Sequence, residues 1–148
     1  MSKKLDCLFL VVSSSKRSYQ KLSEKYSAIE PPTWALLLAQ SMRAYGYKVK
    51  ILDANAEKLN EEQIFKKIQN QDPKLICFVV YGQNVNAGTA NMSGAVHVSK
   101  YLKKNNENFK ISFVGSHVQA LPKETLINEK SIDFVFTNEG VYSLRNIL

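Results

Sequence analysis

The chain has 148 residues, of which 45% are hydrophobic and 22% charged, and its formal net charge is +7. This length fits one domain with one buried core, and the composition is ordinary for a globular protein. No apolar run approaches the roughly 18 residues that cross a bilayer, and the short basic start lacks the long apolar core of a signal peptide. We therefore expect no membrane partner and a cytoplasmic location.

The positive charge is spread along the chain rather than gathered. Most lysines fall where amphipathic helices would face water, so a solvated surface is the first interpretation, with an anionic ligand or an acidic partner as alternatives. No nucleic-acid partner is expected, because the lysines do not interleave with aromatic residues. Cys7 and Cys77 lie inside apolar runs and are expected to be buried thiols. No paired-cysteine spacing is present, so no cysteine-ligated zinc or iron–sulfur site is expected in this chain.

The chain opens with a predicted strand. Leu5–Val12 is an almost unbroken apolar run, as expected for a strand covered on both faces. Thr33–Tyr45 carries apolar residues at helical spacing, Trp34 among them. A second strand, Val49–Leu52, follows this helix.

The middle of the chain begins with a second helix. Asn60 and Gln63 stand in capping-box positions at its start. Leu75–Val80 is rich in β-branched and aromatic residues and is the third predicted strand. The segment Tyr81–Gly94 is polar, uncharged and rich in glycine and asparagine, which predicts a long loop. A third helix is expected from about Gly94 to Lys104.

The same alternation continues to the end. Ile111–Val114 is the fourth predicted strand, Pro122–Asn128 a short helix, Ile132–Phe136 the fifth strand and Val141–Leu148 a last helix. Five strands with intervening helices indicate an α/β doubly wound domain over 1–148. We expect a Rossmann/flavodoxin-like three-layer sandwich with a parallel sheet in the order 2-1-3-4-5. Ligands of such sheets bind beyond the carboxyl ends of the strands, so the loops after strands 1, 3, 4 and 5 matter most.

Two of these loops differ in character. Ser13–Pro32 follows strand 1 and holds serines and basic residues, which fits either phosphate contact or a surface lid. It contains neither a P-loop nor a dinucleotide-binding glycine fingerprint. The uncharged loop after strand 3 suits hydrogen bonding to a polar neutral ligand, although a plain loop is the alternative.

Polar residues also follow strands 4 and 5. Gly115 would let a ligand approach the backbone, and Ser116 and His117 come next. His117 could coordinate a metal, donate a hydrogen bond, move a proton or simply cap a turn, whereas His97 is expected to be structural. Glu139 is favourable at a helix start without any function. No paired carboxylates or nucleophile–base arrangement is visible, so no catalytic residue and no metal ligand is predicted.

Several segments resemble one family. They are Pro31-Pro32, Gly46-Tyr47-Lys48-Val49 leading to Asp53, Val114-Gly115-Ser116-His117 with Pro122 beyond, and Asp133 leading to Asn138-Glu139-Gly140. In this order and spacing the chain resembles the cobalamin-binding domain of B12-dependent radical SAM enzymes. The Asp-x-His-x-x-Gly motif of other cobalamin proteins is missing after strand 1.

The resemblance implies a cofactor-binding module that is not catalytic alone. It implies that cobalamin is bound base-off, without a protein histidine on cobalt, and lined by Gly82, Gln83, Asn84, Asn86, Gly115, Ser116, His117, Asn138, Glu139 and Gly140. It also implies a longer parent, with methyl transfer as one expected activity, whose downstream radical SAM barrel is the partner and binds S-adenosylmethionine and a 4Fe-4S cluster. The alternative is the same fold with corrin binding lost, acting as a substrate- or partner-interaction domain.

Overall fold

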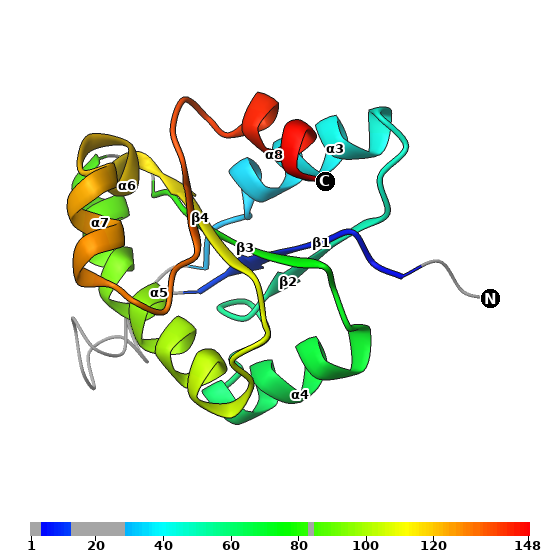
Figure 1. Ribbon diagram of the computed structural model, residues 1–148, viewed down its shortest axis with the longest axis horizontal. Coiled ribbons are helices and arrows are strands. Elements are labelled where there is room, and N and C mark those ends of the chain that lie inside the picture. Colours follow the sequence, from blue (N-terminus) through cyan, green and yellow to red (C-terminus); the bar gives the residue numbers. More distant parts are fainter. Residues whose placement is uncertain (1–3, 13–28, 83–84) are drawn as a thin grey trace.

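The computed structural model describes residues 4–12, 29–82 and 85–148. Its centre is a five-stranded parallel sheet in the order β2-β1-β3-β4-β5 (Figure 1). The predicted fold class and strand order are therefore confirmed. The strands are β1 Cys7–Val11, β2 Val49–Asp53, β3 Leu75–Val80, β4 Ile111–Gly115 and β5 Phe134–Phe136.

Helices cover both faces of this sheet. The pair α3 and α8 lies on one face, and α4 and α5 lie on the other, with α6 and α7 beside α5 (Figure 1). The described helices are α3 Thr33–Ala44, α4 Glu61–Gln71, α5 Val85–Asn105, α6 Ser116–Ala120, α7 Pro122–Asn128 and α8 Val141–Ile147. None of these helices is both long and apolar enough to cross a bilayer.

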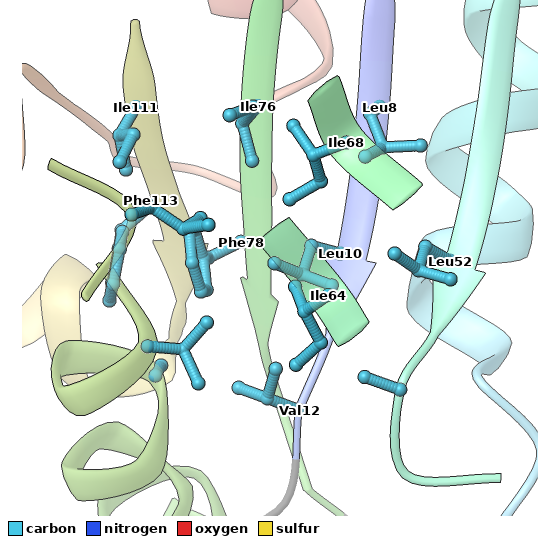
Figure 2. Packing of buried hydrophobic residues seen from close by; sticks show 14 of the residues in the cluster. Leu8, Leu10, Val12, Leu52, Ile64, Ile68, Ile76, Phe78, Ile111 and Phe113 are labelled. Atoms are coloured by element: carbon cyan, nitrogen blue, oxygen red, sulfur yellow. The ribbon is translucent and has the colours of Figure 1, made fainter. Parts of the chain in front are cut away.

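Each face of the sheet has its own apolar layer. Side chains alternate along a strand, so Leu8 and Leu10 of β1 point to α4 and α5, while Cys7 and Phe9 point to α3 and α8. Figure 2 shows Ile64 and Ile68 of α4 over the first of these layers. In the same layer Phe78 and Phe113 stack with ring centroids 4.7 Å apart. Two buried layers on one sheet explain why the strands read as nearly continuous apolar runs.

Two aspartates fasten the amino ends of the strands. Asp6 accepts hydrogen bonds from the Lys48 backbone N–H at 2.8 Å and from the Lys74 ammonium at 2.7 Å. Asp133 accepts from the Ile111 backbone N–H at 2.7 Å and pairs with the Lys103 ammonium at 2.8 Å. These contacts tie neighbouring strands together at the amino edge of the sheet. The loops that carry the candidate site residues lie at the opposite, carboxyl edge.

The third helix differs from the prediction. It begins at Val85, so most of the segment predicted as a long polar loop is helical. Asparagine, glycine, threonine and serine are weak helix formers, so the helical conformation of this segment depends on tertiary packing. Met92 and Ala95 of this helix are buried in the core, and Gly88 lies against α6. The short helix α6 was not predicted either.

Candidate functional site

The carboxyl ends of the strands bring the candidate residues to one edge of the sheet. The strand order reverses between the central strands β1 and β3, and the helix after β1 lies on one face of the sheet while the helix after β3 lies on the other. A doubly wound sheet binds ligands at such a switch point. The loop after β1 runs through residues 13–28, which lie outside the described part of the chain, so this side of the edge is represented by the start of α3.

An aromatic pair spans the switch point. Trp34 is the second residue of α3, and Tyr81 directly follows β3. Their rings stack with centroids 4.5 Å apart and planes 22° apart. Trp34 is 40% exposed, whereas Tyr81 is partly buried against the apolar layer beneath α3 and α8. The pair therefore presents an aromatic surface where a ligand would be expected.

Neighbouring groups hold Tyr81 in place and keep it neutral. The Asn91 side-chain amide of α5 donates a hydrogen bond to the Tyr81 carbonyl at 3.3 Å. Burial raises the pKa of the Tyr81 phenol above its ordinary value, and the negative charge of Glu139 raises that pKa further. The phenol is thus uncharged at neutral pH and sits on a fixed backbone.

Sequence reasoning missed this pair. Trp34 was counted among the apolar residues that define a helix, and Tyr81 was placed at the start of a loop. One signal was available, because Trp34 is the only tryptophan of the chain and stands in the first turn of a predicted helix, next to the loop that follows strand 1.

Close packing characterises the other side of the edge, at the start of α5 and between α5 and α6. A side-chain carbon at Gly82 would collide with Ala87, and one at Gly88 would collide with the Ser116 hydroxyl. The Ser116 Oγ is buried and has no hydrogen-bond partner among the described residues. A buried hydroxyl without a partner costs free energy, which makes it a candidate for contact with a ligand.

Gly115 is required by the protein's own backbone. A side-chain carbon at this position would overlap the carbonyl of Val80 on the neighbouring strand. Gly115 was predicted to admit a ligand close to the backbone, and the structure gives it an internal reason as well. Cofactor contact at Gly82 and Gly115 stays a prediction.

The turn after β5 has an uncommon backbone. Asn138, Glu139 and Gly140 all have left-handed dihedrals, with φ of 51°, 48° and 76°. Asn138 and Glu139 are exposed, whereas Gly140 is buried against the Val114 side chain. Consecutive left-handed residues are rare outside glycine, and such geometry concentrates at functional sites. This turn, which the sequence singled out, lies at the same edge as Tyr81.

The two histidines differ in setting. His97 Nε2 lies 2.7 Å from Glu61 Oε1 and joins α5 to α4, which agrees with its predicted structural role. His117 lies in α6, with Nδ1 3.4 Å from the Thr89 hydroxyl of α5. Within residues 4–12, 29–82 and 85–148, no three His, Cys, Asp or Glu side chains are grouped to hold a metal ion.

The remaining predicted site residues are placed as follows. Asn86 is exposed in the first turn of α5. Gln83 and Asn84 lie outside the described residues. The structure therefore gathers the Gly82, Gly115–His117 and Asn138–Gly140 segments at one edge and adds Trp34 and Tyr81 to them.

The chemistry of this edge suits a large, mostly neutral ligand with planar parts. It offers a partly exposed aromatic pair, an exposed turn that carries Glu139, and a hydroxyl without a partner in the described part of the chain. A tight tetrahedral metal centre or a phosphate-gripping glycine loop would need a different set of groups.

Comparison with known proteins matches this chain to a family model and to a curated relative. A family model described as "B12 binding domain" matches residues 20–148. "Uncharacterized methyltransferase PH0819" from Pyrococcus horikoshii is 31% identical to this chain over 118 residues. The match covers 80% of this chain and 24% of that protein. The chain thus spans about a quarter of the length of this curated relative.

Proposed function

The chain belongs to the B12-binding domain family, and we propose that it holds cobalamin over the carboxyl edge of its sheet, beside the switch between β1 and β3. The observation that carries this proposal is the convergence of three separate segments at that edge. They are Tyr81–Gly82, Gly115–His117 and Asn138–Gly140, each at or just beyond the carboxyl end of a strand of the parallel sheet.

The groups at this edge fit such a cofactor. Cobalamin has a wide corrin ring with amide side chains, which need hydrogen-bond partners along its rim. The Ser116 hydroxyl lacks a partner among the described residues, and the exposed turn at Asn138 and Glu139 offers polar groups. Pairing a buried donor or acceptor removes the free-energy cost of leaving it without a hydrogen bond. Ser116 is therefore the side chain that we expect to contact the cofactor.

We propose further that no histidine of this chain binds cobalt and that the cofactor is bound base-off. The two histidines of the chain are His97 and His117. His97 is engaged with Glu61 between two helices, and no histidine occurs in the sequence between β1 and α3. His117 is the residue whose substitution tests this part of the proposal.

The domain is expected to be part of a longer protein. We propose that the domain serves a longer B12-dependent radical SAM enzyme, in which a barrel with S-adenosylmethionine and a 4Fe-4S cluster is the partner. A relative named as a methyltransferase, of which this chain covers 24%, supports a methyltransferase as the parent. When bound, cobalamin supplies a cobalt centre able to carry a methyl group. The residues of this chain would bind the cofactor, orient it and exclude water from one side.

The direct test is a visible-spectrum titration with hydroxocobalamin and methylcobalamin, followed by gel filtration. We expect the protein to retain the colour, and the methylcobalamin spectrum to shift to the base-off form. His117→Ala should leave that shifted spectrum unchanged. Ser116→Ala should weaken retention, because it removes the unpartnered hydroxyl without adding volume.

Two results would contradict the proposal. A spectrum that changes with His117→Ala would mean that this histidine binds cobalt. No retained colour, either with this chain or with the longer parent protein, would instead favour a domain that has lost corrin binding and serves as an interaction module.

A further inference from the structure

We propose that the outer face of helices α3 and α8 is a protein interface, and that its partner is the remaining part of the longer parent protein. Leu37 and Tyr45 contribute to this face from α3 and its end, and Tyr142 and Arg145 contribute from α8. These four residues are called the α3–α8 face. The surface that fits it is apolar and carries a carboxylate for Arg145. The inference rests on the proposed assignment to a longer parent, and it does not depend on the bound cofactor.

Exposed apolar side chains gather on this side of the sheet. Leu37, Ser41 and Tyr45 recur at intervals of four residues, which places them on one side of α3. Leu37 is 58% exposed, Tyr45 54% and Tyr142 71%. Other exposed apolar residues of the same two helices are Trp34, Leu36 and Ile147. The large apolar side chains described on α4 and α5, across the sheet, are all buried or partly buried. An exposed apolar group of this kind is typical of an interaction surface.

The charges of the two helix layers differ in the same way. Helices α3 and α8 carry one charged side chain each, Arg43 and Arg145, and no acidic residue. The charged side chains of α4 are Glu61, Glu62, Lys66 and Lys67. A mixed charge pattern suits water, whereas tyrosine and arginine without acidic residues match the composition of protein interfaces.

Arg145 is held between two tyrosine rings. Its guanidinium carbon lies 5.1 Å from the centre of the Tyr45 ring and 5.2 Å from the centre of the Tyr142 ring. Its Nη1 donates to the Tyr45 hydroxyl at 3.3 Å, and its backbone carbonyl accepts from the Tyr47 hydroxyl at 3.1 Å. Within the described residues no carboxylate pairs with Arg145. The guanidinium is therefore oriented in advance and retains donors for a carboxylate of a partner.

The position of this face favours the rest of the parent protein as its occupant. Helices that follow parallel strands begin at the carboxyl edge, so the first turns of α3 and α8 lie beside the edge proposed to hold the cofactor. Figure 1 shows the two helices together on one face of the sheet. This chain spans 24% of its curated relative, so most of that protein lies outside the matched domain. A neighbouring part that reaches the cofactor edge extends directly onto the α3–α8 face.

A second copy of this chain is the alternative occupant. A twofold interface brings the same surface of two copies together. Because neither α3 nor α8 has an acidic residue, Arg145 of each copy would find no carboxylate on the facing helices. Charge complementarity therefore favours a different protein surface over a second copy.

The test is hydroxyl-radical footprinting read by mass spectrometry, on this chain and on the longer parent protein, each with and without hydroxocobalamin. We expect oxidation of Tyr45 and Tyr142 to fall severalfold in the parent, whether or not the corrin is present. Tyr101 of α5 is the matched control ring, since it packs against Phe65 of α4 on the opposite face of the sheet. Its oxidation should be the same in both proteins.

Variants of the parent test the role of the arginine. Arg145→Glu should return Tyr142 oxidation to the level of this chain alone, because a negative charge would face the partner's carboxylate. Arg145→Lys should keep part of the protection, since the charge stays but the planar fork is lost. Lys66→Glu makes the same charge change on exposed α4 and should keep all of it. Circular dichroism melts confirm folding, and Leu37→Asp gives an independent reading if Arg145→Glu does not fold.

The other outcomes separate this inference from the proposed function. Unchanged oxidation of Tyr45 and Tyr142 in a parent that retains cobalamin overturns the interface and leaves the proposed function intact. Protection in a parent that retains no cobalamin supports the interface and contradicts the cofactor assignment. Protection that Arg145→Glu leaves unchanged overturns the proposed partner chemistry. A dimer of this chain in sedimentation, with both tyrosines already protected, would assign the face to a second copy and overturn the proposal.

Discussion

At the scale of single residues, glycines near the candidate site are constrained by the protein's own backbone. A side-chain carbon at Gly115 would overlap the Val80 carbonyl, and one at Gly82 would meet Ala87. Bulky residues at either position would therefore disturb the sheet edge whether or not a ligand is present. Loss of corrin binding in such variants would not identify a contact residue, and substitution of Ser116 is the more informative one.

Gly88 and Ser116 offer a residue-level prediction about helix packing. Alanine stabilises a helix interior by about 1 kcal/mol relative to glycine, but the new carbon of Gly88→Ala would meet the Ser116 hydroxyl. We therefore expect Gly88→Ala to give little or no stabilisation in the wild-type chain. In a Ser116→Ala background the gain of about 1 kcal/mol should appear, because the obstructing oxygen is gone.

Urea unfolding of the four proteins in this cycle measures the coupling between the two positions. The Ser116→Ala single variant is the control, and it should be neutral or stabilising, since it removes a buried hydroxyl that has no partner among the described residues. If Gly88→Ala changed the unfolding free energy equally in both backgrounds, the contact between α5 and α6 would not be as described.

At the scale of elements, the start of α4 is defined by a capping box in which both reciprocal hydrogen bonds are present. The Asn60 side chain accepts from the Gln63 backbone N–H at 2.9 Å, and the Gln63 side chain accepts from the Asn60 N–H at 2.9 Å. Asn60→Ala should lower the unfolding free energy by about 1 kcal/mol, because backbone donors of the first turn lose their partner. Asn60→Ser, which keeps a capping oxygen, should lose much less. Equal losses in the two variants, measured by urea midpoints, would exclude the cap as the cause.

Local signals explain which elements could be predicted. The capping box, the apolar strands and Pro122 at the start of α7 all act within a few residues, and the sequence shows them directly. The first turns of α5 have no such signal, since Asn86, Gly88 and Asn91 are weak helix formers. Their helix depends on burial of Met92 and Ala95 and on contact with α6, which only the folded chain provides.

The same distinction applies to the candidate site. Gly115 and the Asn138–Gly140 turn could be located from sequence because they lie at or just beyond the ends of strands, and parallel strands end at one edge. The Trp34–Tyr81 stack joins residues far apart in the chain, and no local sequence pattern predicts the contact. Motif residues also have structural roles, as Asp53 accepts the Asn55 and Ala56 backbone N–H groups at 3.1 and 2.9 Å.

At the scale of the whole molecule, both cysteines report on the integrity of the central sheet. Cys7 of β1 and Cys77 of β3 are fully buried in the layer beneath α3 and α8. Burial is the main cause that raises the pKa of the Cys77 thiol from 9.0 to about 12 and that raises the pKa of Cys7 well above 9.0. Only opening of the whole layer would expose these thiols to solvent as thiolates.

This burial predicts a loss of stability in alkaline solution. Below pH 9 the Cys77 thiol is protonated in both the folded and the unfolded chain, so its contribution is fully present. Between about pH 9 and 12 the unfolded chain releases the proton while the folded chain keeps it, so rising pH favours unfolding. The slope for one such group is about 1.4 kcal/mol per pH unit.

Urea unfolding at pH 7.5 and pH 10 should therefore show a larger fall in unfolding free energy for the wild-type chain than for Cys77→Ala. The variant leaves a small cavity, but that cost is the same at both pH values and cancels in the comparison. An identical fall in the two proteins would mean that Cys77 ionises as readily in the folded chain as in the unfolded one. Because β3 is central in the sheet, that result would require water to reach the middle of the apolar layer without unfolding. The apolar layer around Cys77 would then not be closed to solvent as described.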